Sequence, residues 1–236
     1  MDGIRSLDAR AARVDRDHVL RAVGYPSARD ASARVLEILP SLTEGTLLRA
    51  RPVAAFRVEA DFEVRKRSIR LADRTSFHGP LLARAVAPAT QLVLFALTTG
   101  QEIEAWLGEL AARDVLAGFL AEAIASDLVE ALADRFQEDL TSDLAPRGLV
   151  GSPRYSPGYC DWPIRDVPAL LARVGAGRIG VALTEGGLMV PRKSLCGLVA
   201  FGPDAGAMAR LPCDACVRDC PHRRAPHAPR SSSTAP

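Results

Sequence analysis

Helical and strand-like patterns follow one another in an irregular order along this chain, and that order constrains the fold more than any other feature. Residues Glu102–Leu140 are rich in Ala and Leu and predict one or two long helices, with Gly118 as a candidate break. Apolar runs at Gln91–Leu97 and Leu195–Phe201 predict strands, and the first of these reads as a central strand. Because the elements do not alternate regularly, we expect an α+β protein with a mainly antiparallel, twisted sheet and flanking helices.

The shorter elements follow from changes in the hydrophobic period. We predict helices at Arg16–Val23, Ala28–Leu39 and Asp166–Val174, and strands at Leu47–Val58, Phe62–Leu71 and Arg178–Leu183. The glycines of Gly175–Gly180 match a dinucleotide-binding fingerprint literally, but that motif needs a strand before it and a helix after it. Here the order is reversed, so these glycines are interpreted as a helix end and a turn.

Composition excludes several classes of function. The chain has 236 residues, a net charge of +2 and 25% charged residues, which favours neither nucleic acid nor anionic membranes as a partner. Its first ten residues are too charged for a signal peptide, and no apolar run has the length of a membrane span. We therefore expect a soluble cytoplasmic protein with one domain over residues 1–222. Residues 223–236, rich in Pro, Arg, Ser and His, are predicted to be a disordered tail.

The segment Arg154-Tyr-Ser-Pro-Gly-Tyr159 is the strongest candidate for a binding site. Pro157 fixes φ and Gly158 permits a positive φ, so the backbone can turn sharply and approach a ligand closely. Arg154 can bind a carboxylate through two hydrogen bonds, and Tyr159 adds a flat aromatic face. By itself, such a segment is also compatible with an ordinary turn.

Two further segments accompany this one and carry a resemblance to a known family. The helical stretch Asp127–Arg135 contains Ala-Leu-Ala-Asp-Arg, and Gly180–Ser194 contains a strand and a Gly-Gly loop. Together with the Arg-x-x-x-Gly-Tyr signature and in the same order, they resemble the activation domain of cobalamin-dependent methionine synthase. The resemblance covers the C-terminal half of the chain and is typical of a stand-alone homologue of that domain.

The resemblance implies that the protein binds S-adenosylmethionine and supports reductive methylation of oxidised cobalamin on a separate chain. Arg154 would bind the carboxylate of this ligand, Glu138 its ammonium, and the Pro157-Gly158-Tyr159 backbone would line it. Glu185 is a second candidate for a ligand contact. The chain lacks a cobalamin-anchoring Asp-x-His-x-x-Gly motif and offers no convincing catalytic residue, so its contribution would be to orient the methyl donor.

The resemblance also implies partners. Cobalamin would be carried by a methionine synthase chain or another corrinoid methyltransferase, and flavodoxin or ferredoxin would donate the electron. After Gly158-Tyr159 the chain departs from the family pattern, because Cys160-Asp161-Trp162 stands where the family has Pro-Ala and a histidine a few residues on. The alternative function is that of a non-catalytic binding or assembly platform for a corrinoid protein, with a structural zinc site.

Three cysteines, Cys213, Cys216 and Cys220, lie within eight residues and predict a metal site. Their order reproduces the last three cysteines of a bacterial ferredoxin motif, which favours an iron–sulfur cluster that relays an electron. Zinc is the alternative, since a tetrahedral Cys3His site would satisfy it. The fourth ligand would be Cys196, Cys160 or His222.

Overall fold

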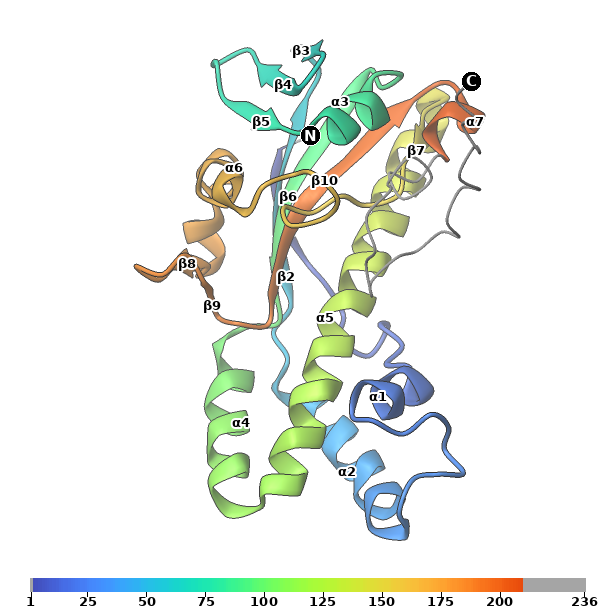
Figure 1. The fold of residues 1–236 in the computed structure, drawn as a ribbon, viewed down its shortest axis with the longest axis vertical. Coiled ribbons are helices and arrows are strands. Elements are labelled where there is room, and N and C mark those ends of the chain that lie inside the picture. Colours follow the sequence, from blue (N-terminus) through green and yellow to red (C-terminus); the bar gives the residue numbers. More distant parts are fainter. Residues whose placement is uncertain (1, 210–236) are drawn as a thin grey trace, which may run out of the picture. The chain divides into compact units, whose positions relative to one another are not determined.

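The computed structural model describes residues 2–209 and has an α+β fold (Figure 1). The helices are α1 (Arg16–Ala22), α2 (Ala33–Arg49), α3 (Pro80–Val86), α4 (Gln101–Arg113), α5 (Val115–Leu144), α6 (Val167–Val174) and α7 (Ala205–Met208). The strands are β1 (Gly3–Ser6), β2 (Val53–Glu59), β3 (Phe62–Arg65), β4 (Ser68–Leu71), β5 (Ser76–His78), β6 (Gln91–Thr98), β7 (Val150–Gly151), β8 (Ala182–Leu183), β9 (Met189–Val190) and β10 (Ser194–Gly202).

The main sheet has five strands in the order β1-β2-β6-β10-β7. β1 pairs antiparallel with β2, and β7 pairs antiparallel with β10. Hydrogen bonds from Thr90 N to Phe201 O and from Thr99 N to Lys193 O join opposite ends of β6 and β10, so this pair is antiparallel as well. All eight residues of β6 are buried, which confirms the predicted central strand. The predicted α+β fold with a mainly antiparallel sheet is confirmed.

The chain forms two compact units, which are described separately. Among the described residues, unit 1 comprises residues 2–57, 95–140 and 170–196, and unit 2 comprises residues 58–94, 141–169 and 197–209. The predicted boundary of a single domain at residue 222 lies outside the described residues and stays a prediction.

The core of unit 1 lies between helix α5 and the sheet. Every fourth residue of α5 from Leu120 to Leu140 is buried, which forms one apolar stripe along the helix. Phe136 on this stripe contacts Phe56 of β2 and Phe95 of β6, with ring centroids 5.7 and 5.5 Å apart. Although α5 has 30 residues, no helix in the described part of the chain is long and apolar enough to cross a membrane.

The predicted helical region Glu102–Leu140 contains two helices, but Gly118 does not separate them. The break is at Asp114, whose extended backbone ends α4 and whose carboxylate accepts a hydrogen bond from Ala117 N at 3.0 Å. Gly118 instead lies within α5, where a Cβ atom would stand 2.6 Å from Ala111 Cα of α4. The glycine therefore lets two antiparallel helices approach closely (Figure 1).

Three predicted boundaries in the N-terminal half are wrong: both ends of the second helix and the start of the strand after it. The second helix begins at Ala33, capped by the Ser32 hydroxyl, and continues through Pro40 to Arg49, so the start predicted for the following strand is helical. Buried Leu39, Leu42 and Thr46 follow the helical period, whereas the alternation of apolar residues and Arg from Leu48 to Arg51 imitates a strand.

The predicted strand Phe62–Leu71 is a hairpin of β3 and β4, with Val64 opposite Ile69. An odd spacing cannot place both side chains on one face of a single strand, so the sequence did contain the signal for a turn. The predicted strand Arg178–Leu183 is also wrong, because residues Ala176–Ile179 form a 3-10 turn and only Ala182–Leu183 is extended. Gly175 and Gly180 both have left-handed backbones, which confirms the interpretation as a helix end and a turn.

Unit 2 contains the hairpins β3-β4-β5, the helix α3 and the C-terminal half of β10. Phe77 of β5 and Trp162 pack edge to face with ring centroids 5.6 Å apart, and both are buried. Trp162 belongs to the loop between β7 and α6, which contains the predicted Arg154–Tyr159 segment. The core of unit 2 thus holds the candidate site segment in place.

Candidate functional site

The Arg154–Tyr159 segment is anchored along β10. Ser152 N donates to Ala200 O at 2.7 Å, and the Ser152 hydroxyl accepts from Ala200 N at 3.0 Å. Three residues later, Tyr155 and Leu198 exchange both backbone hydrogen bonds, at 2.9 and 2.8 Å. The start of the site segment is therefore attached to a buried strand, which is more rigid than a free loop.

Gly197 makes this attachment sterically possible. A Cβ atom at this position would lie 2.2 Å from Tyr155 O and 3.0 Å from Ser156 Oγ. A carbon atom cannot approach a carbonyl oxygen so closely, so any larger residue would push the site segment away from β10. Sequence reasoning missed this glycine, which looked like an ordinary residue within a predicted strand.

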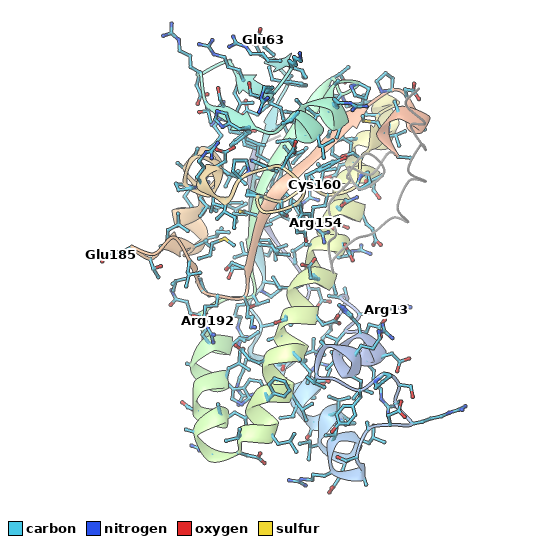
Figure 2. The ribbon with its side chains drawn as sticks, in the orientation of Figure 1. Arg13, Glu63, Arg154, Cys160, Glu185 and Arg192 are labelled. Atoms are coloured by element: carbon cyan, nitrogen blue, oxygen red, sulfur yellow. The ribbon has the colours of Figure 1, made fainter. Side chains whose placement is uncertain are left out.

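The segment then reverses direction through two consecutive turns. Tyr159 N donates to Ser156 O at 3.0 Å around Pro157 and Gly158, and Gly158 has φ 97°. Proline followed by a residue with positive φ is the signature of a type II turn, so the predicted Pro-Gly turn is confirmed. Trp162 N donates to Tyr159 O at 3.0 Å in the second turn, where Cys160 has φ 52°. Figure 2 shows Arg154 and Cys160 within this loop.

Asp161 fixes the far end of the double turn to α3. Its carboxylate accepts hydrogen bonds from Leu81 N at 2.6 Å and Leu82 N at 3.3 Å. These are N–H groups in the first turn of α3, and Gly79 before them has no side chain to cap them. Asp161, which the sequence shows only as a departure from the family pattern, is thus a cap supplied by a distant segment.

Asp166 forms a second link between the loop and the β5–α3 connection. It is 5% exposed and accepts a hydrogen bond from His78 N at 2.7 Å, and its carboxylate also contacts the His78 ring at 3.1 Å. No local pattern predicts this pair, because the two residues are 88 positions apart. Trp162, 2% exposed, is a core residue.

The two turns, residues 156–162, form the double turn of the site segment. Arg154, just before it, and Tyr159, within it, differ in accessibility. Arg154 is 7% exposed, whereas Tyr159 is 38% exposed. A buried guanidinium binds a carboxylate more strongly than one in water, because little solvent screens the interaction. A protected cation, a glycine turn and an accessible ring can together bind a ligand that carries a carboxylate and a flat group.

The structure places the two predicted acidic residues in unit 1, whereas Arg154, Pro157, Gly158 and Tyr159 are together in unit 2. Glu138 lies on α5 with 69% of its side chain exposed, and Arg135 Nη1 is 3.7 Å from its carboxylate. Arg135 also pairs with Asp139 at 3.0 Å.

Glu185 is exposed in the turn between β8 and β9. Thr184 N donates to Leu188 O, and Gly187, with φ 78°, donates its N–H to Thr184 O, both at 2.9 Å. The chain that follows β9 is held by α5, because Lys193 Nζ lies 2.8 Å from Ser126 Oγ and 3.2 Å from the Glu122 carboxylate.

Cys213, Cys216 and Cys220 lie outside the described residues, as does His222. Within residues 2–209, no group of three or more His, Cys, Asp and Glu side chains is arranged to hold a metal ion. Of the other two candidate ligands, Cys160 is half-buried, and burial raises the pKa of the Cys196 thiol to about 12. The metal prediction therefore stays a prediction.

The hollows found in unit 1 do not involve the predicted residues. One of about 350 Å³ lies between α1, α2 and α5, with an apolar lining that includes Val19, Leu36, Leu39 and Ile124. A second, of about 460 Å³, is lined by residues 6–10 and 47–53. Neither hollow is lined by a buried charged side chain, so the double turn is the stronger candidate for a binding site.

Comparisons with known proteins identify the family and the fold of the chain. No curated protein matches the chain. A crystal structure described as the MetH reactivation domain bound to AdoHcy is similar in fold, with a TM-score of 0.62 and 18% sequence identity over 86% of this chain and 79% of that one. The family model for the vitamin B12 dependent methionine synthase activation domain matches residues 82–210, which include the double turn and more than half of the chain. This chain belongs to the family of vitamin B12-dependent methionine synthase activation domains.

Proposed function

We propose that this protein binds S-adenosylmethionine and presents its methyl group to oxidised cobalamin on a partner chain. The partner is a methionine synthase or another corrinoid methyltransferase. The family match supports the cobalamin context, and the AdoHcy in the similar crystal structure supports a ligand of this class. The observation that carries the proposal is the double turn, in which buried Arg154 precedes a glycine turn and an accessible Tyr159.

The overall reaction consumes one electron and one methyl group. The electron, from flavodoxin or ferredoxin, reduces Co(II) to Co(I); the cobalt then forms a bond to the methyl carbon as the carbon–sulfur bond breaks, which releases S-adenosylhomocysteine. The chain itself contributes position rather than a nucleophile. Arg154 binds the carboxylate of the methyl donor, the Pro157-Gly158-Tyr159 backbone lines it, and Glu138 binds its ammonium.

The exposure of Glu138 is compatible with this role, since 69% of its side chain is accessible to solvent. Glu185 is a second acidic contact in the proposal, placed on a turn that a ligand can reach. Glu138→Gln removes the charge but keeps the shape of the side chain. We expect it to weaken binding of S-adenosylmethionine, while Glu109→Gln on the exposed face of α4 leaves the affinity unchanged.

A reactivation assay tests the proposal directly. A methionine synthase without its own activation domain is loaded with cob(II)alamin and mixed with this protein, S-adenosylmethionine and titanium(III) citrate as reductant. We expect methylcobalamin to form, as followed by its absorbance spectrum, at a rate that depends on this protein. A rate that is the same without the protein would contradict the proposal and favour the assembly-platform alternative.

The three C-terminal cysteines enter the proposal as an electron relay, with a structural zinc site as the alternative. Metal analysis and an absorbance spectrum of anaerobically purified protein distinguish the two. Iron together with absorbance that Cys213→Ser abolishes would support the relay. One equivalent of zinc in a colourless protein would support the structural site.

A further inference from the structure

His78 and Asp166 form a hydrogen-bonded pair whose outer nitrogen is available to a ligand. Asp166 is 5% exposed, and both of its oxygens face His78. Oδ2 accepts from His78 N at 2.7 Å, and Oδ1 lies 3.1 Å from the ring Nδ1. The backbone and the ring of one histidine are therefore oriented by a single buried carboxylate.

This arrangement determines which ring nitrogen carries the proton. An ionised carboxylate can only accept hydrogen bonds, so Nδ1 of His78 must be the donor. In the neutral imidazole the lone pair is then on Nε2, which forms no hydrogen bond with any of residues 2–209. The His78 side chain is 49% exposed. With a neutral ring, the pair thus presents a fixed hydrogen-bond acceptor to the outside.

The acceptor lies beside the site segment. The neighbours of His78 on both sides contact the double turn. Phe77 packs against Trp162 with centroids 5.6 Å apart, and a Cβ atom on Gly79 would lie 2.7 Å from Asp161 Oδ1. Asp161 follows Tyr159 by two residues, so the segment that carries His78 packs against the double turn.

We propose that His78, oriented by Asp166, accepts a hydrogen bond from a carboxamide N–H group on the rim of the corrin ring carried by the partner. This inference rests on the proposed function, since it names a contact between this chain and the partner's cobalamin. A lone pair repels carboxylates and phosphates and selects donors. The corrin rim carries primary carboxamides, which are donors of this kind. His78 is a positioning residue here, because it orients the corrin and does not react.

The first test observes the ring directly. Protein labelled with ¹⁵N-histidine is titrated with dicyanocobinamide, whose cyanide ligands on both axial positions prevent coordination by histidine. We expect the Nδ1–H tautomer in the free protein, and a shift of the Nε2 resonance on titration. The His78→Asn spectrum assigns the signal. A dicyano-corrin with its carboxamides hydrolysed to carboxylates should not cause the shift.

A free protein in which Nε2 of His78 carries a proton, in the Nε2–H tautomer or in the imidazolium, would overturn the inference. So would an unchanged Nε2 resonance with dicyanocobinamide, or an equal shift with the carboxylate corrin, because each outcome removes the selective acceptor.

The second test uses paired substitutions. Asn places its amide near the position of Nδ1, and Gln reaches the position of Nε2. We expect His78→Asn to weaken binding of the cob(II)alamin-loaded methionine synthase about threefold to tenfold, the contribution of one hydrogen bond, and His78→Gln to restore most of it. Equal affinities of wild type and His78→Asn would overturn the inference.

The affinity for S-adenosylmethionine separates the two proposals. His78→Asn should bind this ligand as the wild type does. If wild type does not bind S-adenosylmethionine at all, the proposed function fails. If it binds normally but the partner affinity does not depend on His78, only the present inference fails.

Discussion

Substitution of Gly197 by alanine tests the steric argument on which the site geometry depends. The new Cβ atom would lie 2.2 Å from Tyr155 O, about 1 Å inside normal contact, and the obstacle is backbone rather than a flexible side chain. To make room for the Cβ atom, the site segment must move away from β10 or β10 must distort. Moving away breaks the two hydrogen bonds between Tyr155 and Leu198, at about 0.5–1.5 kcal/mol each, and distortion has a similar cost. Alanine also lowers the conformational entropy of the unfolded chain. This stabilises the folded state by less than about 1 kcal/mol and offsets part of the cost.

We therefore expect Gly197→Ala to lower the free energy of unfolding by roughly 1–3 kcal/mol. For a chain of this size, that corresponds to a decrease in Tm of roughly 2–12 °C, measured by circular dichroism. Gly108→Ala is the matched control. Gly108 lies within α4 with nothing within 4 Å of its Cβ position, so alanine there should stabilise the helix by about 0.5–1 kcal/mol. If Gly197→Ala were as stable as the wild type, the attachment of the site segment to β10 would be wrong.

Three other predictions follow from single contacts. Gly118→Ala should destabilise the protein by about 1–3 kcal/mol in urea unfolding, since its Cβ would lie 2.6 Å from Ala111 Cα; unchanged stability would contradict the close approach of α4 and α5. Asp161→Ala should cost about 1–2 kcal/mol through loss of the α3 cap and accelerate hydrogen exchange in α3, and unchanged exchange there would contradict this role. Cys196 should resist iodoacetamide at pH 8 much longer than half-buried Cys160, because burial raises its pKa to about 12 and leaves little thiolate; mass spectrometry showing equal alkylation would contradict this.

The sequence predicted those parts of the fold whose signals are local. The buried run of β6 and the Pro157-Gly158 turn both depend on residues close together in the chain, and both appear where predicted. The hairpin of β3 and β4 also had a local signal, because the odd spacing between Val64 and Ile69 interrupts the alternation expected of a single strand.

The contacts that fix the site could not be predicted in this way. Asp161 caps a helix 80 residues earlier in the chain, and Asp166 orients a histidine 88 residues earlier. Gly197 has an ordinary backbone conformation, and its importance comes only from the carbonyl group of Tyr155 beside it. Such features depend on which segments meet in space, and no periodicity in a single sequence encodes that.

The most direct test of the account is calorimetric titration of S-adenosylmethionine into wild type and Arg154→Ala. Arg84→Ala, on the exposed side of α3 in the same unit, is the control, and circular dichroism establishes that each variant is folded. Arg154→Lys keeps the charge but loses the paired hydrogen bonds. We predict saturable binding to wild type and Arg84→Ala, and an affinity lower by about tenfold to a hundredfold in Arg154→Ala, as expected for a charged hydrogen bond. Absence of binding to wild type, or equal affinity in a folded Arg154→Ala protein, would contradict the account.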